Sequence, residues 1–246
     1  MNVLASNIII IPSYNETLAL PELLKELRLG LTHHDAVIVM DDSPVEISNE
    51  VETKCRDAVR DFQFDFKFYN SEYKSGRGAA VRRGMKIAFS EFPNFRTVIE
   101  CDADGSHRAE DILKIKNSLS KADLLVGSRY LKSSKIIGWP ASRRIFSWSL
   151  NKSIPRLTGV RLRDITNGLR RYSKSAVEAI LSETQVNKGF IYLSEQAIVI
   201  SRASLVISEE PIVFVDRTLG SSTVTWREIS NSLIGIFKLV LANHRR

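Results

Sequence analysis

Two aspartates one residue apart are the part of this sequence best suited to chemistry. Asp102 and Asp104 stand directly after the apolar, β-branched run at residues 97–99, which predicts a buried strand. At the carboxyl end of a strand in an open α/β sheet, such residues lie in the crevice where ligands bind. Carboxylate oxygens there suit Mg²⁺ or Mn²⁺ that also holds a substrate diphosphate. The alternative is a solvated turn that caps the next helix, since Asp, Gly and Ser all favour turns.

The elements that must position this pair alternate along the chain. A second acidic turn, at Asp41 and Asp42, follows a second apolar run. Alternating strands and helices predict an α/β fold with a mostly parallel sheet covered by helices on both faces. The predicted strands are residues 8–11, 36–40, 64–68, 97–99, 123–127, 205–207 and 212–215. The predicted helices are residues 21–29, a polar segment before residue 64, and residues 75–89, 109–119, 140–154, 176–181, 191–202 and 226–243.

Composition limits the class of protein. The chain has 246 residues, of which 43% are hydrophobic and 26% charged, as expected for a globular protein with a packed core. The excess of 35 Lys and Arg over 28 Asp and Glu favours anionic partners such as nucleotides, phosphorylated substrates, acidic lipids or nucleic acid. Cys55 and Cys101 form no disulfide or zinc pattern, and no apolar run is long enough to span a membrane. A cytoplasmic location is therefore expected.

Six short motifs in a fixed order resemble those of the dolichyl-phosphate mannose synthases and related polyprenyl-phosphate sugar transferases of glycosyltransferase family 2. They are Ile-Pro-Ser-Tyr-Asn-Glu at 11–16, Asp-Asp-Ser-Pro at 41–44, Asp-Ala-Asp at 102–104, Gly-Ser-Arg-Tyr at 127–130, Gly-Trp at 138–139 with Arg143 and Ser147, and Val-Asp-Arg at 215–217. The resemblance implies a GT-A fold, with residues 1–225 forming one catalytic domain. Residues 226–246 would form a basic amphipathic helix that contacts a membrane or a partner. Simple packing of that helix onto the domain remains an alternative.

The resemblance also implies a site, residue by residue. It assigns the metal to Asp102, Asp104 and, as a weaker ligand, Ser106. The acceptor's phosphate would be gripped by Arg129, Arg143 and Ser147, which with Asp104 make up the expected catalytic set. The nucleotide-sugar would contact Pro12, Tyr14, Glu16, Met40, Asp42, Asp102, Ala103, Asp104, Arg129 and Arg217. The plainer alternatives are packing for Tyr14, a helix N-cap for Asp42 and solvated helix faces for the arginines.

The implied reaction moves a hexosyl group, with GDP-mannose as the favoured donor, onto a polyprenyl monophosphate with inversion. Mg²⁺ or Mn²⁺ would be the cofactor. The protein would sit peripherally on the cytoplasmic face of a membrane, with a small membrane-anchored subunit as a possible further partner. Because the acceptor's phosphate is already ionised, no side-chain base is needed.

Other functions stay open at this point. The donor could be a UDP-sugar, or the acceptor a sugar hydroxyl, which would need a carboxylate base such as Asp164. A basic nucleic-acid-binding module is disfavoured, because the positive charge is spread along the sequence rather than clustered with aromatic residues, and because no recognition motif is present. No nucleic-acid partner is therefore expected. An inactive interaction subunit is disfavoured because both Asp102 and Asp104 are present.

Overall fold

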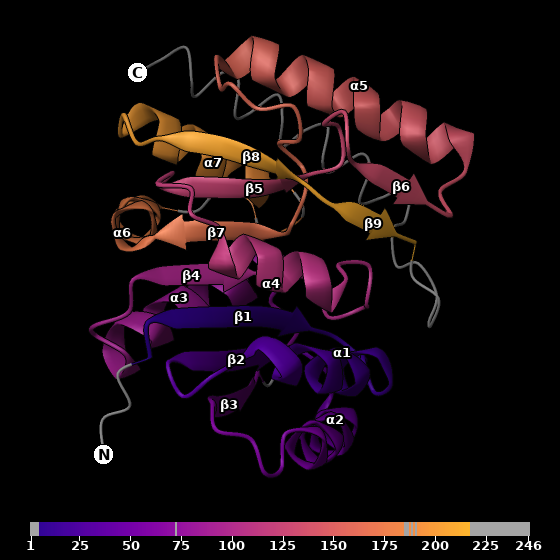
Figure 1. Ribbon diagram of the computed structural model, residues 1–246, viewed down its shortest axis with the longest axis vertical. Coiled ribbons are helices and arrows are strands. Elements are labelled where there is room, and N and C mark those ends of the chain that lie inside the picture. The colour runs from indigo at the N-terminus through magenta and orange to yellow at the C-terminus, as the bar shows by residue number, and fades with distance from the viewer. Residues whose placement is uncertain (1–4, 72, 185–186, 188, 190, 217–246) are drawn as a thin grey trace.

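A seven-stranded, mostly parallel sheet forms the centre of the molecule (Figure 1). The computed structural model describes residues 5–71, 73–184, 187, 189 and 191–216. The strand order is β3-β2-β1-β4-β7-β5-β8, and only β7 runs antiparallel to its neighbours. The bounds are β1 Asn7–Ser13, β2 Asp35–Asp41, β3 Asp65–Asn70, β4 Thr97–Glu100, β5 Leu124–Ser128, β7 Arg170–Ser173 and β8 Ile207–Pro211.

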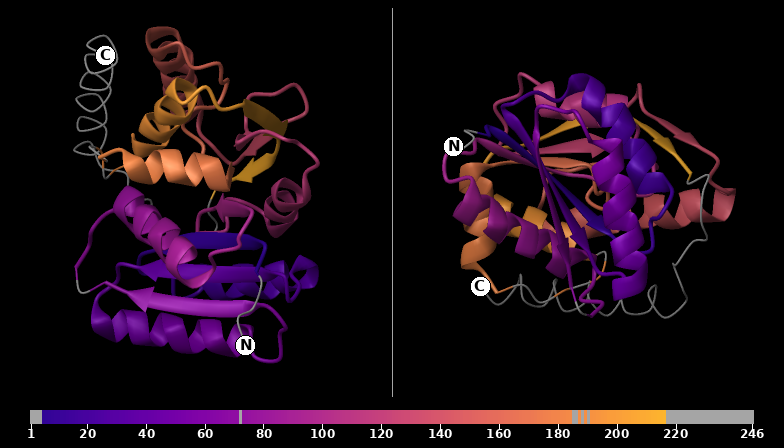
Figure 2. Two further views of the ribbon diagram at one scale, coloured as in Figure 1. Left: turned by 90° about the vertical axis from the view of Figure 1, so that its left-hand side faces the viewer. Right: turned by 90° about the horizontal axis from the view of Figure 1, so that it is seen from below.

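The middle strands are apolar along their whole length because helices cover both faces of the sheet. Every residue of β2 is buried, and Ile8, Ile9, Ile10 and Ile11 of β1 have no exposed surface. One face is covered by α1 (Ala19–Leu27), α2 (Val45–Ala58) and α4 (Ala109–Asn117), and the other by α3 (Arg77–Glu91), α6 (Lys174–Ser182) and α7 (Tyr192–Arg202) (Figure 2). The predicted α/β architecture is confirmed.

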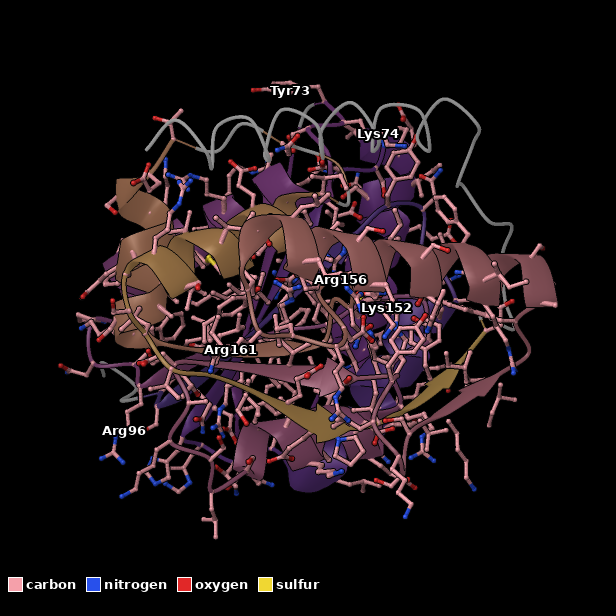
Figure 3. The ribbon with its side chains drawn as sticks, turned by 90° about the horizontal axis from the view of Figure 1, so that it is seen from above. Tyr73, Lys74, Arg96, Lys152, Arg156 and Arg161 are labelled. Atoms are coloured by element: carbon pink, nitrogen blue, oxygen red, sulfur yellow. The ribbon has the colours of Figure 1, made fainter. Side chains whose placement is uncertain are left out.

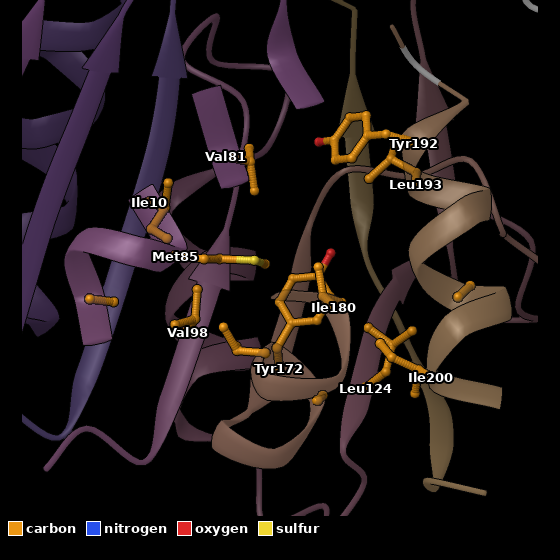
Figure 4. Close-up of a cluster of buried hydrophobic side chains, with 14 of the residues drawn as sticks. Ile10, Val81, Met85, Val98, Leu124, Tyr172, Ile180, Tyr192, Leu193 and Ile200 are labelled. Atoms are coloured by element: carbon orange, nitrogen blue, oxygen red, sulfur yellow. The ribbon is translucent and has the colours of Figure 1, made fainter. Parts of the chain in front are cut away.

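The core beneath α3, α6 and α7 contains two tyrosines among aliphatic side chains (Figure 4). Tyr172 of β7 and Tyr192 of α7 are both fully buried, close to Val81, Met85 and Ile180 in the same cluster. A buried tyrosine hydroxyl needs a hydrogen-bond partner. These two hydroxyls therefore mark a polar network inside an otherwise apolar core.

Two strands were not predicted from the sequence, and a third was misplaced. β7 was missed because it begins with Arg170 and Arg171. Two adjacent charged residues do not give the apolar pattern from which a central, buried strand is predicted. The three-residue β6 (Lys135–Ile137) was too short to predict; it pairs with β9 (Val213–Val215) in a small second sheet. The strand predicted at residues 205–207 instead begins at Ile207 and continues through the Glu209-Glu210-Pro211 stretch that was expected to be a turn.

The topology brings the predicted motifs to one edge of the sheet. The chain moves outward from β1 through β2 to β3 and then returns to β4 on the other side of β1. The carboxyl ends of β1 and β4 therefore form a topological switch point, where open α/β sheets bind ligands. Because β7 is antiparallel, its beginning lies at the same edge as the ends of β4 and β5.

Candidate functional site

The site is built on the ion pair between the first motif aspartate and an arginine at the start of α3. Arg77 Nη2 lies 2.7 Å from Asp102 Oδ1, and Arg77 Nη1 lies 2.7 Å from Glu100 Oε1. Gly168 makes room for this guanidinium, since a Cβ at that position would stand 2.5 Å from Arg77 Nη2. Arg77 thus connects the last residue of β4 to the Asp-x-Asp motif that follows it.

A buried hydrogen-bond network holds Glu100 and Arg77 in place. The Glu100 carboxylate accepts hydrogen bonds from the Tyr172 hydroxyl, at 2.9 Å, and from the Tyr192 hydroxyl. Burial lowers the pKa of Arg77, but the carboxylates of Asp102 and Glu100 outweigh burial and hold the pKa well above its ordinary value. Burial, together with the Glu100 charge, raises the pKa of Tyr172 and Tyr192 well above the ordinary value. Arg77 is therefore a permanent cation beneath the motif.

The motif itself offers oxygen atoms to a divalent cation. Asp104 Oδ1 accepts a hydrogen bond of 3.0 Å from the backbone N–H of Ser106. The Ser106 hydroxyl is buried and has no hydrogen-bond partner among the described residues. Such an orphaned hydroxyl is costly unless a ligand satisfies it. Two carboxylates and a hydroxyl fit a Mg²⁺-like ion.

Only part of a metal's coordination sphere would come from the protein. Among the described residues no three His, Cys, Asp or Glu side chains are grouped to hold an ion. This suits an ion that is shared with a substrate, because Mg²⁺ commonly binds one or two carboxylates and completes its octahedron with phosphate oxygens and water. The residues present fit a metal–diphosphate site better than a permanent metal centre.

His107 joins two parts of the site through hydrogen bonds. Its fully buried ring accepts a hydrogen bond from the Asp102 backbone N–H at Nδ1, at 3.1 Å, and its Nε2 lies 3.1 Å from Asn167 Oδ1. With Nδ1 accepting, Nε2 carries the proton and donates it to Asn167. The Asn167 amide in turn donates to the Gly127 carbonyl at the end of β5. His107 therefore ties the acidic motif to the β5–β7 side of the site.

The Asp42 carboxylate holds the loop that precedes α3. Its Oδ2 accepts hydrogen bonds from Ser75 N and Oγ, both at 2.8 Å, and from Gly76 N at 3.1 Å. Its Oδ1 pairs with Arg83 Nη2 at 2.7 Å. The alternative role as a helix N-cap is not seen, since α2 has Pro44 at its N-cap position. Asp42 instead fixes the loop that carries Arg77 toward the motif.

The other predicted donor residues line the carboxyl ends of β1, β2 and β4 to different degrees. Tyr14 and Glu16 follow β1 and are partly exposed, and Lys74 lies over the Tyr14 ring at 3.9 Å. Pro12 is also partly exposed, within β1. In contrast, Met40 and Ala103 are buried in the core. The Met40 side chain packs close to Gly84 of α3, so it points into the core and not toward a ligand.

Arg129 is committed to an internal carboxylate. Its Nε and Nη2 pair with Asp164 Oδ2 and Oδ1, both at 2.8 Å, and its backbone N–H donates to the same carboxylate. Nη2 also donates to Thr166 Oγ1 at 2.9 Å. Burial lowers the pKa of Arg129, but Asp164 outweighs burial and raises it overall. This bidentate pair is buried, so Asp164 has no accessible oxygen with which to act as a base.

Arg143 is the more accessible of the two predicted acceptor arginines. It lies in the first turn of α5 (Ala141–Thr158), about a third of its side chain is exposed, and Nη1 pairs with Asp216 Oδ1 at 2.7 Å. The guanidinium stacks over Trp139 at 4.2 Å from the ring centroid. Gly138, at φ 88°, lets Asp216 come close enough to pair with Arg143, because a Cβ at residue 138 would meet Asp216 Cβ at 2.8 Å.

Ser147 faces inward from α5. Its Oγ accepts a hydrogen bond of 2.8 Å from the Tyr130 hydroxyl, and Asn151, one turn later, donates to the Ser147 carbonyl at 2.9 Å. Asn151 also donates to Thr166 Oγ1 at 2.9 Å, and Thr166 contacts Arg129. Ser147 and Arg129 therefore belong to one polar cluster.

Aromatic rings join the acidic and basic halves of the site. Phe214 of β9 packs edge-on against His107, at 5.5 Å between centroids, and against Trp139, at 5.2 Å. Arg129 lies 5.1 Å from the Trp139 centroid and 5.3 Å from that of Phe214. A continuous chain of contacts thus runs from Asp102 through His107, Phe214 and Trp139 to Arg143.

Sequence reasoning missed Arg77, Arg83, Asn151 and Asn167. For Arg77 the available signal was the Ser-Gly-Arg-Gly stretch at residues 75–78, where a helix begins and its backbone N–H groups can face an anion. That signal did not indicate a role for the Arg77 side chain. Two predictions lie outside the described residues: the donor contact of Arg217 and the terminal helix at residues 226–246. Within the part of the chain that is described, none of the helices has the length and apolar content to cross a bilayer.

Comparison with solved structures identifies the fold. A glucosyl-3-phosphoglycerate synthase from Mycobacterium tuberculosis, in complex with Mn²⁺, UDP-glucose and phosphoglyceric acid, superposes with a TM-score of 0.65 at 13% identity, covering 97% of this chain and 79% of that one. A mannosyltransferase from Pyrobaculum calidifontis in complex with GDP-Man and Mn²⁺ gives 0.62 at 14% identity, covering 96% and 64%. At such identities the likeness shows the fold alone, which is the GT-A fold.

Sequence comparison identifies the family. An undecaprenyl-phosphate mannosyltransferase of Micrococcus luteus is 30% identical over 234 residues, covering 95% of this chain and 93% of its own. A polyprenol monophosphomannose synthase of Mycolicibacterium smegmatis is 28% identical over 238 residues, covering 93% and 84%. The sequence model for glycosyl transferase family 2 matches residues 8–181. The chain therefore belongs to glycosyl transferase family 2.

Proposed function

We propose that this protein transfers a hexosyl group, with mannosyl favoured, from a nucleoside-diphosphate sugar to a polyprenyl monophosphate, inverting the anomeric centre. The observation that carries the proposal is the joining of two half-sites at one sheet edge. The Asp102 and Asp104 carboxylates suit a metal-bound diphosphate, and Arg143 on α5 suits a second phosphate. The contact chain through Phe214 and Trp139 joins them.

The donor half lies over the carboxyl ends of β1, β2 and β4. Tyr14 and Glu16 are partly exposed there and can contact the base or ribose through a ring face and a carboxylate. Asp42 acts on the same half indirectly, by holding the loop at Ser75 and Gly76. Arg217, which follows the described part of the chain, is proposed as a cationic contact to the diphosphate.

A divalent cation, Mg²⁺ or Mn²⁺, would be held by Asp102 and Asp104, with the orphaned Ser106 hydroxyl as a third protein oxygen. When bound, such an ion would neutralise the negative charge that builds up on the leaving diphosphate. The chain prepares for this charge by placing the permanent cation of Arg77 against Asp102, so that the carboxylate is oriented before the substrate arrives.

The acceptor half centres on Arg143. A lipid phosphate would compete with Asp216 for the Arg143 guanidinium and could accept a further hydrogen bond from the Tyr130–Ser147 hydroxyl pair. The phosphate monoester is already ionised and needs no base. The contribution of these groups is positioning, so that the phosphate oxygen meets the anomeric carbon in line with the departing diphosphate. Arg129, through Asp164, supports the floor of this half rather than reaching outward.

Transfer to a sugar hydroxyl is the less favoured alternative. That reaction needs an accessible carboxylate to remove the hydroxyl proton. Asp164 was the candidate, but it is fully buried and both of its oxygens bind Arg129. The choice between a GDP- and a UDP-sugar rests on the relatives: the two sequence relatives are mannose-transferring proteins, and the fold neighbours include both nucleotide types.

Action on a lipid-linked acceptor implies work at a membrane surface, proposed here to be the cytoplasmic face. A small membrane-anchored subunit is a further candidate partner.

The proposal is tested with purified protein, a water-soluble short-chain prenyl phosphate and radiolabelled GDP-mannose, UDP-glucose or UDP-galactose, each with Mg²⁺, Mn²⁺ or EDTA. Metal-dependent transfer of mannose to the prenyl phosphate is expected. Hydrolysis of the donors without transfer to the prenyl phosphate would overturn the proposal.

A further inference from the structure

The positive charge of the chain is concentrated in one segment, contrary to the sequence-based expectation that it is spread. Residues 124–163 contain nine Lys and Arg residues and no Asp or Glu. Because the whole chain has a net charge of +7, the remainder has a small net negative charge. This basic segment comprises β5, β6 and α5 and the loops between them.

The same segment exposes an unusual share of large apolar side chains. Of the eleven large hydrophobic residues that are exposed in the described part of the chain, five lie between residues 137 and 157. Trp148 and Ile145 are 52% and 65% exposed, and the others are Ile137, Phe146 and Leu157. Apolar surface gathered in this way on a monomer marks a contact surface.

α5 is a surface helix that exposes large apolar and basic side chains on the side facing away from the domain. It packs on the domain through a narrow face that contains Ser147, Asn151 and Ile154. At 100° per residue, Ile145 and Trp148 point away from that face, and Lys152 and Arg156 lie between and beside them. The Lys152 ammonium lies 5.7 Å from the Trp148 ring centroid. Figure 3 looks down on this end of the molecule, where α5 lies across the view with Lys152 and Arg156 along it.

We propose that the outer face of α5, formed by Ile145, Trp148, Lys152 and Arg156, lies on the surface of a bilayer that contains anionic lipids. Tryptophan and aliphatic side chains enter the interface, and lysine and arginine contact lipid phosphates. This inference rests on the proposed function. The inner side of the same helix carries Ser147 and Arg143, so a helix lying on the bilayer would hold the acceptor half of the site at the depth of lipid phosphates.

The positive charge of α5 favours an anionic bilayer over two other possible binding partners for this face, residues 217–246 and a second copy of the chain. Residues 217–246 of this chain contain five Lys and Arg and one Glu, so this segment has the same sign of charge as α5. A second copy related by a two-fold axis would place one basic α5 against another, because a two-fold interface uses the same patch twice. An anionic lipid surface has the complementary charge and also accepts the apolar side chains.

Co-sedimentation with vesicles tests the proposal with the full-length protein. We expect the wild type to bind vesicles of phosphatidylcholine with 30 mol% phosphatidylglycerol and to bind pure phosphatidylcholine weakly. Two double variants, Ile145→Asp/Trp148→Asp and Lys152→Glu/Arg156→Glu, should each lower the partition coefficient at least about tenfold.

The matched controls change polarity and charge equally at exposed positions elsewhere. They are Leu29→Asp/Leu119→Asp and Lys54→Glu/Arg56→Glu. α2, which carries the second control pair, lies at the opposite end of the molecule from α5 (Figure 1). Equal loss in variants and controls, or no loss in either α5 variant, would overturn the proposal.

Tryptophan quenching tests whether α5 itself contacts the bilayer. Trp148 should be quenched by brominated phosphatidylglycerol in vesicles, and Trp148→Phe should remove most of that quenching. Unchanged quenching in Trp148→Phe would assign the contact to another tryptophan and refute the proposal. Sedimentation velocity without lipid should give the same oligomeric state for the wild type and Ile145→Asp/Trp148→Asp. Dissociation of a wild-type dimer by these substitutions would mean that a second copy covers this face.

Failure of this inference can be told apart from failure of the proposed function. Vesicle binding is measured without donor or acceptor, so it does not depend on the reaction. Turnover of a water-soluble short-chain prenyl phosphate should be unchanged in Lys152→Glu/Arg156→Glu, whereas turnover of a long-chain prenyl phosphate embedded in anionic vesicles should fall at least about tenfold. A wild type that binds vesicles through α5 but glycosylates neither acceptor would refute only the proposed function.

Discussion

Arg77 and Asp102 form an ion pair of 2.7 Å in which a cation from the start of α3 holds the first carboxylate of the Asp-x-Asp motif. The arginine is held in turn by Glu100 and Tyr192 in the core. The acidic motif is therefore oriented by buried groups beneath it as well as by the turn in which it stands. The position of Asp102 should depend on Arg77 more than on any hydrogen bond within the turn.

Replacing Arg77 by methionine should impair both stability and metal-dependent donor binding. Glu100 would lose its buried countercharge, a change that costs about 3–5 kcal/mol when one partner of a buried pair is removed. Asp102 would lose its orienting contact. We expect calorimetry to show weaker binding of GDP with Mn²⁺, and urea unfolding to show lower stability, with Arg77→Lys intermediate in both.

Arg82→Met is the matched control for Arg77. Arg82 lies on the same helix and donates to the carbonyls of Ile180, Leu181 and Glu183, away from the motif. It should lower stability without changing Mn²⁺-dependent nucleotide affinity in the folded protein. If Arg77→Met and Arg82→Met lowered nucleotide affinity equally, the orienting role of Arg77 would be refuted.

Asp104→Asn should leave the fold intact and abolish metal-dependent donor binding. Asp104 is partly exposed, and an amide oxygen at this position could also accept the hydrogen bond that Oδ1 accepts from Ser106 N. A neutral amide is a poor ligand for a hard divalent cation compared with a carboxylate. The melting temperature without metal should stay within a few degrees, and the stabilisation by GDP with Mn²⁺ should vanish. Near wild-type turnover with Mn²⁺ would contradict the assignment.

Arg143→Ala should weaken use of the acceptor while donor affinity stays nearly unchanged. A charge-assisted contact is worth roughly 1.5–3 kcal/mol, or about one to two decades in kcat/KM for the acceptor. Lysine should rescue only in part, because it replaces a planar fork and loses the stacking on Trp139. Ser147→Ala should act in the same direction more weakly. Unaltered kinetics with a short-chain prenyl phosphate would leave Arg143 as a surface residue.

Asp164→Asn should act mainly on stability. The substitution leaves the buried Arg129 guanidinium without its countercharge, at a cost of about 3–5 kcal/mol. Urea unfolding should show this loss, and the folded fraction should keep its pH–rate profile. A general base would behave differently: its removal would leave stability unchanged and abolish a limb of the pH–rate profile.

Acid should destabilise the protein through Asp35. Burial raises the pKa of this carboxyl, but hydrogen bonds from Asn7, at 2.8 Å, and Lys116, at 3.0 Å, outweigh burial and lower the pKa below its ordinary value of about 3.9. A lowered folded-state pKa contributes stability that is complete above the unfolded value and is lost as pH falls through the folded value. Asp35→Asn should therefore flatten the fall in unfolding free energy as the pH falls below about 4. Parallel pH profiles for the two proteins would rule this out.

The strands and helices that carry apolar periodicity were predictable, and so was the acidic edge that they form. β1, β2 and β4 are continuous apolar runs, because both faces of the sheet are covered. β7 could not be predicted, because its buried arginines are satisfied by carbonyls that are mostly far away in the sequence. Arg171 donates to the carbonyls of Ile115, Ser118 and Ser120, and Arg170 donates to that of Leu193. Such partners are invisible until the chain has folded.

The same limit applies to the site. The motifs brought Asp102, Asp104 and Arg143 to one edge, but they could not show that Arg129 is occupied by Asp164 or that Met40 faces the core. Arg77 shows the converse. It has no local signal as a functional residue, and its role arises only because α3 begins beside the end of β4.

The linkage formed in the product tests the central claim most directly. Wild-type protein would be incubated with GDP-mannose, Mn²⁺ and a short-chain prenyl phosphate, and the purified product examined by ³¹P and ¹H NMR. The account predicts that the acceptor's monoester becomes a diester joined to C1 of mannose, with the anomeric configuration opposite to that of the donor. An acceptor that remains a monoester while mannose is released to water, or a product with the donor's configuration, would contradict it.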